Sequence, residues 1–147
     1  MRIKIRNAQL KDVLKIYLLG RKIAELGFSK KFSFHEKGEL KESIKDRDSI
    51  MIVAETPKKI VGFLYAKIIF HRAGGWCMLD NLAVEQEYRQ HGIGSALLEL
   101  LYKTLKKKKV NYVQVLEDIH SKNTRNFWKS KGFKETKTFI WAEKKIK

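Results

Sequence analysis

Two glycines one residue apart separate an apolar run from a helical pattern, in the segment Arg89-Gln90-His91-Gly92-Ile93-Gly94-Ser95. Neither glycine carries a Cβ, so the backbone can pass close to a ligand there. The helix that follows begins with unpaired N–H groups and the positive end of its dipole, which together attract phosphate oxygens. The segment therefore predicts a site for a cofactor that carries a pyrophosphate.

Two common phosphate-binding motifs do not fit this segment. A dinucleotide fingerprint requires a third glycine at position 97, where this chain has Leu97, and it normally lies in the first βα unit. The Gly-x-x-x-x-Gly-Lys-Ser/Thr loop of nucleotide triphosphatases is absent from the sequence. The pattern Arg/Gln-x-x-Gly-x-Gly/Ala does fit, through Arg89, Gly92 and Gly94, preceded by Asp80-Asn81-Leu82-Ala83-Val84 and by Tyr88. In these residues the chain resembles the GNAT superfamily of N-acetyltransferases.

This resemblance extends over essentially the whole chain and implies a cofactor and a reaction. The cofactor would be acetyl-CoA, and its acetyl group would pass directly to a primary amine within a ternary complex. The amine would be a small, polyamine-like compound, a protein N-terminus or a lysine, and pairing into a homodimer is a further option. Carried over by motif position, the residues that would bind acetyl-CoA are Leu82, Ala83, Val84, Arg89, Gln90, His91, Gly92, Ile93, Gly94, Ser95, Asn123 and Phe127.

Asp80 is the carboxylate that the sequence favours as a general base acting through water. An amine must be neutral to attack, and a lysine-like amine, with a pKa of about 10.4, needs that help more than an α-amine near 8. Asp80 lies in the apolar run 77–82, where burial of a carboxylate is costly unless the group is paired or functional. The resemblance gives it the place of the acidic residue in diamine-acetyltransferase-like members. A salt bridge with a nearby lysine is the open alternative, and Glu117 is the reserve base.

The departing thiolate has no evident proton donor in the sequence. GNAT members often carry a tyrosine four residues before the glycine that ends the last helix, and in Phe127-Trp128-Lys129-Ser130-Lys131-Gly132 that place is taken by Trp128. An indole N–H is not a useful acid, so we expect Trp128 to be a packing residue. A thiol pKa of about 8.5 makes the thiolate a fair leaving group without help. Tyr88 or a water molecule is the alternative donor.

Composition narrows the class of protein. The 147 residues, 44% apolar and 33% charged, predict one globular domain over residues 1–147. A single cysteine, Cys77, excludes an intrachain disulfide, favours the cytoplasm and is expected to be buried. The scattered histidines predict no metal site. We expect no signal peptide and no contact with a membrane, because the most apolar stretch, 60–70, is too short to span one.

The formal net charge of +16, from 32 basic and 16 acidic residues, favours anionic partners. Contact with nucleic acid or with an acidic protein is therefore an option, although solvated lysines explain the charge equally well. An alternative function follows from it: a non-catalytic CoA-binding or basic nucleic-acid-binding module on the same fold.

Hydrophobic periodicity predicts an α+β protein. We expect a GNAT-like mixed sheet of six or seven strands flanked by about four helices, with an aromatic loop at 28–35 that contains Phe28, Phe32 and Phe34. The expected strands are 2–6, 49–55, 60–70, 76–84, 110–116 and 133–142. The expected helices are 10–26, 36–46, 122–131 and one after the glycine turn, with one face marked by Ile93, Ala96, Leu97, Leu100, Leu101 and Leu105.

Overall fold

The computed structural model describes residues 1–23, 26, 34–72 and 74–147. These residues form two compact units, Met1–Leu116 and Glu117–Lys147, and each unit is described by itself. The expectation of one domain over the whole chain stays a prediction. The aromatic loop at 28–35 lies outside the described residues except for Phe34 and His35.

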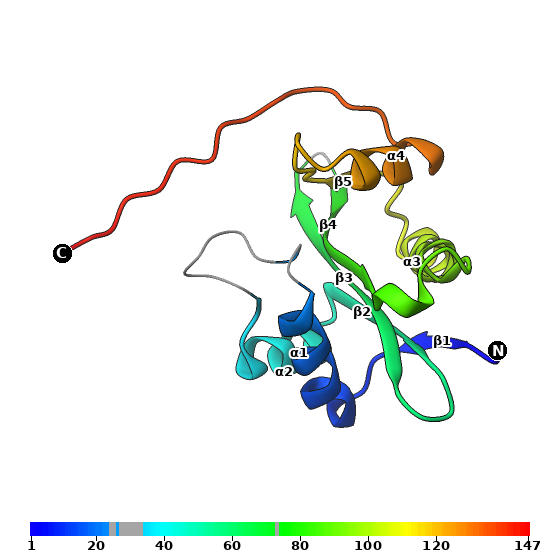
Figure 1. Ribbon diagram of the computed structural model, residues 1–147. Coiled ribbons are helices and arrows are strands. Elements are labelled where there is room, and N and C mark those ends of the chain that lie inside the picture. The colour runs from blue at the N-terminus through cyan, green and yellow to red at the C-terminus, as the bar shows by residue number, and fades with distance from the viewer. Residues whose placement is uncertain (24–25, 27–33, 73) are drawn as a thin grey trace. The chain divides into compact units, whose positions relative to one another are not determined.

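The first unit is built on a mixed five-stranded sheet in the order β1-β2-β3-β4-β5 (Figure 1). The first four strands pair antiparallel, and β5 runs parallel to β4. Their bounds are β1 Lys4–Asn7, β2 Ser49–Glu55, β3 Ile60–His71, β4 Gly74–Val84 and β5 Val113–Val115. The Thr56–Lys59 turn closes the predicted hairpin between β2 and β3, where the Thr56 N–H donates to the Lys59 carbonyl oxygen.

Helices cover both faces of this sheet (Figure 1). The helices α1 (Val13–Lys22) and α2 (Lys37–Lys45) lie on one face, and α3 (Ile93–Lys107) lies on the other. The core under α1 and α2 includes Ile16, Leu40, Val53, Phe63 and Ala83. On α3 the predicted face is confirmed in part: Ile93, Leu97, Leu101 and Leu105 are buried. Ala96 and Leu100 are half-buried, and Leu98 is buried as well.

The second unit contains one helix among its described residues, α4 (Lys122–Ser130). Gly132 has φ = 85° just beyond it, and the N–H groups of Gly132 and Phe133 donate to the carbonyl oxygens of Lys129 and Trp128. The prediction that Gly132 ends the last helix is therefore confirmed. Trp128 is buried against the edges of the Phe127 and Phe133 rings, with centroids 5.1 and 5.0 Å away.

The fold class and the four helices agree with the sequence prediction, but the expected six or seven strands are wrong, because the described residues form five. Residues 133–142 form no strand. Their apolar side chains, Phe139, Ile140 and Trp141, follow one another without alternation and are between 69% and 94% exposed. A strand that offers no buried face gains little from pairing.

Several element boundaries also differ from the prediction. Helix α1 ends at Lys22 and not near residue 26, and β4 begins at Gly74, two residues early. The strand expected over 110–116 is limited to Val113–Val115, because Val110 still bonds to the end of α3 through the Leu105 carbonyl oxygen. Among the described residues, no helix combines the length and the apolar character needed to cross a bilayer.

Candidate functional site

The turn before α3 has the backbone geometry that its glycines predict. Gly92 is the N-cap residue, with φ = 76°, and no side chain caps the helix there. The Ala96 N–H donates to the Gly92 carbonyl oxygen as the first helical bond. The N–H groups of Ile93, Gly94 and Ser95 therefore have no carbonyl acceptor inside the helix. A Cβ built on Gly92 would meet nothing within 4 Å, so the turn is open to a ligand.

Two side chains in this turn bond to the backbone around it. His91 Nδ1 lies 2.7 Å from the Arg89 carbonyl oxygen, and Gln90 adopts a left-handed conformation with φ = 62°. The Arg89 Nε donates to the Val84 carbonyl oxygen at 2.9 Å, which ties the turn to the end of β4. The donors offered to a pyrophosphate are thus main-chain N–H groups on a braced turn, and that donor set suits the group.

Among the described residues of the first unit, one edge of β4 has no strand partner next to this turn. There the pairing of β4 with β5 runs only from Cys77↔Val113 to Leu79↔Val115. The Glu85 N–H donates to the Val61 carbonyl oxygen of β3 at 2.8 Å. Main-chain groups of an antiparallel strand alternate in direction, so those of Leu82 and Val84 point away from β3, toward the open edge. Such an edge offers a donor and an acceptor to an amide-bearing arm such as pantetheine.

A β-bulge places Asp80 where this open edge begins. Tyr65 of β3 pairs with Asn81 and Ala66 pairs with Leu79, so Asp80 is an extra residue without a partner on β3. Bulges turn a side chain away from its regular direction and often occur beside active sites. The sequence predicted the candidate base but not the bulge, because no glycine or proline marks it.

The Asp80 carboxylate lies on the sheet face that α1 and α2 cover. Its side chain is exposed, yet partial desolvation raises its pKa, while the charges of His35 and Lys67 act in the opposite direction. A raised pKa makes the carboxylate a stronger base than an ordinary aspartate. Cys77 of the same strand is fully buried, as predicted, and burial raises the pKa of its thiol to about 12.

The structure adds a histidine to this face that the sequence reasoning missed. His35 Nε2 lies 3.1 Å from Asn81 Oδ1, and its ring stands edge-on to Tyr65 with centroids 5.3 Å apart. The Tyr65 hydroxyl in turn accepts a hydrogen bond of 3.1 Å from the Ser43 Oγ. The sequence does contain a signal for this contact, because the polar pair Asp80-Asn81 interrupts an apolar strand. The prediction used only Asp80 of this pair.

A hollow of about 340 Å³ opens on the same unit between α2 and the strands β2 and β3. Its lining is polar and carries both signs of charge, and it shares Tyr65 and Lys67 with the surroundings of Asp80. The lining residues are Glu42, Ser43, Lys45, Asp46, Ser49, Tyr65 and Lys67.

Tyr88, the weaker candidate for an acid, lies half-buried in the short 3-10 helix Gln86–Tyr88 that leads into the glycine turn. The Lys59 ammonium lies 5.3 Å from its ring centroid. Lys59 also forms an ion pair of 2.6 Å with Glu85, which is buried and pairs with Lys22 as well. This cluster anchors the end of β4.

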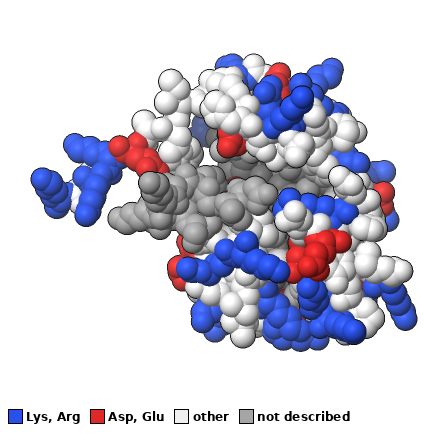
Figure 2. Space-filling view, viewed as in Figure 1, with Lys and Arg blue, Asp and Glu red and all other residues white. Residues whose placement is uncertain are grey.

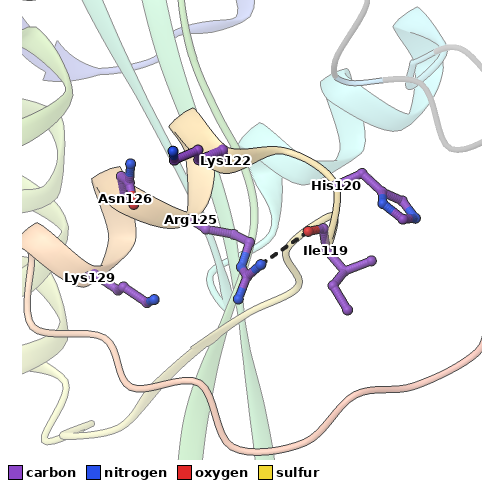
Figure 3. Close-up of a pocket in the computed structure, with 6 residues that line it drawn as sticks. All are labelled: Ile119, His120, Lys122, Arg125, Asn126 and Lys129. Carbon is purple, nitrogen blue, oxygen red and sulfur yellow. Dashed lines mark hydrogen bonds between the residues drawn. The ribbon is translucent and has the colours of Figure 1, made fainter.

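The remaining predicted residues belong to the second unit. Asn123 is exposed on α4, Phe127 is half-buried, and burial together with Glu135 raises the pKa of Glu117. A pocket of about 330 Å³ in this unit contains none of them (Figure 3). It is lined by Ile119, His120, Lys122, Arg125, Asn126 and Lys129. Arg125 donates to the Ile119 carbonyl oxygen and pairs with Glu135.

Positive charge is spread over the face shown in Figure 2. Lysine and arginine side chains occur across it, and acidic ones form smaller groups between them. On that face the basic side chains are thus distributed and do not mark one patch.

Comparison with known proteins gives a consistent result. The family model of the acetyltransferase (GNAT) family matches residues 19–133. The chain is 30% identical to an N-alpha-acetyltransferase of Sulfurisphaera tokodaii, over 91% of this chain and 81% of the relative. In fold it is similar to the PaiA N-acetyltransferase of Thermoplasma acidophilum solved with coenzyme A, with a TM-score of 0.84 and 22% identity over 95% and 94% of the chains. It is also similar to an aminoglycoside acetyltransferase from an uncultured soil metagenomic sample, with a TM-score of 0.82 and 20% identity over 99% and 97%.

Proposed function

Because this chain belongs to the acetyltransferase (GNAT) family, we propose that it moves the acetyl group of acetyl-CoA directly to a primary amine. Acetyl transfer and the use of acetyl-CoA come with the family. The class of amine and the residues that carry the reaction are the proposal. The observation that carries it is the bulge that places Asp80 at the start of the open β4 edge, which leads to the uncapped start of α3.

Binding of acetyl-CoA would rest on the main chain. The N–H groups from Gln90 to Ser95 would receive the pyrophosphate, and the outward groups of Leu82 and Val84 would pair with the amides of the pantetheine arm. The uncapped helix start and the short β4–β5 ladder support this assignment. Asn123 and Phe127 remain proposed contacts on the basis of their motif positions.

The reaction needs one proton removed and one proton supplied. The amine nitrogen attacks the acetyl carbonyl carbon, so a C–N bond forms as the C–S bond to the thiol breaks. Asp80 takes the amine proton through a water molecule, and its raised pKa suits that role. Tyr88 or a water molecule returns a proton to the thiolate, because Trp128 cannot.

An α-amine is the first acceptor to test. The relative at 30% identity is named an N-alpha-acetyltransferase, which supports a peptide or protein N-terminus. An α-amine near pKa 8 is also about a tenth neutral at pH 7, so its deprotonation depends less on a single carboxylate base than that of a lysine-like amine. Polyamines and lysine side chains follow in the order of testing.

The test is release of free thiol from acetyl-CoA with a panel of amines, run beside calorimetry with acetyl-CoA alone. We expect heat on binding and thiol release with at least one class of amine. Neither heat nor a shift of the melting temperature at millimolar acetyl-CoA would contradict the cofactor site. Binding without release from any amine would instead favour the alternative, a CoA-binding module without turnover.

The net charge of +16 and the replacement of the usual tyrosine by Trp128 are the observations that favour this alternative. A basic module would bind RNA with a steep dependence on salt, because each neutralised phosphate releases counterions. RNA titrations at two salt concentrations separate it from the transferase.

A further inference from the structure

A side-chain hydrogen bond joins the segment before α2 to the strand that carries Asp80. His35 Nε2 and Asn81 Oδ1 are 3.1 Å apart, and an amide oxygen only accepts, so the imidazole donates from Nε2. Asn81 is only 4% exposed. Loss of a partner by a buried amide is costly, so this bond is a firm link between the two elements.

The imidazole ring is held on its other sides as well. Its centroid lies 5.3 Å from those of Phe34 and Tyr65, both in edge-to-face contact. Nδ1 lies 3.8 Å from the Glu39 carboxylate of α2. Among the described residues, the charged groups near the ring are therefore Glu39 from α2 and Asp80 from β4, with Lys67 of β3 acting on the same Asp80. The ring has little freedom to change its direction.

The hydrogen bond between His35 and Asn81 matters because Asn81 directly follows the bulge residue Asp80. Asn81 pairs with Tyr65 across the ladder, whereas Asp80, the residue before it, has no cross-strand partner. The ladder therefore fixes the backbone at Asn81, whereas it does not fix the orientation of the peptide group at Asp80 in the bulge. A hydrogen bond that holds the Asn81 side chain restricts the orientation of this adjacent peptide group.

We propose that His35 is a positioning residue for Asp80, which acts through its hydrogen bond to Asn81 to direct the bulge and its carboxylate toward the acceptor amine. The inference rests on the proposed function, because it assigns a task to the same base. His35 itself needs no contact with substrate. Its removal changes the geometry of proton transfer and leaves the main-chain site for acetyl-CoA intact.

Lys67 provides a matched control on the same face. The charges of His35 and Lys67 both lower the pKa of Asp80, but of the two only His35 bonds to Asn81. Lys67→Gln thus removes a charge alone. His35→Gln removes the charge and keeps a side-chain N–H donor, and His35→Ala removes both.

The experiment measures kcat and KM for the amine and for acetyl-CoA across pH. We expect His35→Ala to lower kcat about tenfold with the KM for acetyl-CoA unchanged, since a misplaced catalytic group affects the chemical step. His35→Gln should recover most of kcat. Both His35→Gln and Lys67→Gln should move the acid limb of the profile to higher pH, because each removes a charge that lowers the pKa of Asp80.

A double-mutant cycle tests the route of the effect. If His35 acts through Asn81, the double variant His35→Ala/Asn81→Ala should be no slower than either single variant. If His35→Ala does not fold, the cycle is run with His35→Leu, which removes the N–H donor but keeps a bulky side chain, and with Asn81→Ser, and acetyl-CoA affinity reports the integrity of the other site. Losses that multiply, or a failure of His35→Gln to recover kcat, overturn the inference.

The outcome also separates this inference from the function on which it rests. Wild-type protein without turnover on any amine removes the proposed function and this inference with it. Wild-type turnover together with an undiminished kcat in His35→Ala removes the inference alone.

Discussion

In the proposed site, the edge of β4 contributes main-chain groups, whereas the face of β4 contributes side chains. Along the edge that points away from β3, Leu82 and Val84 offer main-chain groups, and the start of α3 adds further N–H donors. On the face under α1 and α2, the contribution comes from side chains, chiefly Asp80, Asn81 and His35. In the proposed site, one strand would thus serve two ligands, acetyl-CoA by its backbone and the amine by its side chains.

The main-chain half and the side-chain half of the proposed site therefore differ in the substitutions that they tolerate. A main-chain site accepts many side chains but requires particular backbone angles, such as the φ of 76° at Gly92. A side-chain site depends on charge, pKa and the supports that hold each group. Substitutions on the edge should therefore affect acetyl-CoA binding, and substitutions on the face should affect turnover and its pH dependence.

Asp80→Asn should produce the largest effect. With a lysine-like amine we expect kcat to fall about a hundredfold, within the usual range for loss of a general base, and with an α-amine we expect a smaller loss. Steady-state kinetics with both amines measure the ratio. Glu87→Gln, an exposed carboxylate elsewhere on the unit, is the control. Equal losses with both amines would show that Asp80 does not act as the base.

Gly92→Ala should affect the edge next. A left-handed residue with a Cβ costs about 1–2 kcal/mol, so we expect lower stability and weaker acetyl-CoA binding. Gly38→Ala is the matched control, because a Cβ there also meets nothing within 4 Å but Gly38 lies within α2. It should stabilise the protein by about 0.5–1 kcal/mol. Urea unfolding and calorimetry of both variants test the pair, and a loss of the same sign in both would mean that φ is not the cause.

The difference between a main-chain half and a side-chain half also explains how well each could be predicted from the sequence. The backbone geometry of the edge was predictable because glycine spacing, a helix start and an apolar strand are local patterns, and they led to the turn at residues 89–95 and to a helix after it. A left-handed backbone conformation such as that of Gly92 favours glycine at that one position, so the glycine can be recognised in the sequence without knowledge of the fold.

The face was predictable only in part. Asp80 was proposed because a carboxylate in an apolar strand is unusual, but His35, which bonds to the neighbouring Asn81, lies 46 positions before Asn81 in the chain. A contact of that separation depends on how α2 packs on the sheet, which no local pattern contains. The last strand failed for the opposite reason, since residues 133–142 have the composition of a strand but show no alternation that buries one face.

The pH dependence of stability should distinguish Asp80 from structural carboxylates. Partial desolvation raises the folded-state pKa of Asp80 above its unfolded value of about 3.9, so its contribution to stability is complete below that value and falls as pH rises through the folded pKa. At pH 7 the group therefore costs stability, and Asp80→Asn should raise the melting temperature while it lowers activity.

Asp12 should show the reverse sign. It is 1% exposed and burial opposes its charge, yet hydrogen bonds from Arg6 and from the Gln9 N–H lower its pKa. Its contribution is present above the unfolded pKa and is lost as pH falls through the folded one. Asp12→Asn should thus lower the melting temperature at pH 7 without a change in KM. Melting curves from pH 3 to 7 test both variants, and the same slope for both would contradict the assignment of Asp80 as a functional group held at a cost.

Arg89→Ala should give the smallest effect and provides the sharpest comparison of the two halves. The Arg89 Nε donates to the Val84 carbonyl oxygen, an outward group of the edge, so this side chain braces a main-chain site without taking part in proton transfer. One hydrogen bond contributes about 1 kcal/mol, which corresponds to a rise of about fivefold in the KM for acetyl-CoA with kcat unchanged. Arg21→Ala, which removes an exposed arginine bonded to the Tyr17 hydroxyl, is the control. A fall in kcat as large as that of Asp80→Asn would mean that the edge also governs the chemical step, and the division between a backbone half and a side-chain half would then be wrong.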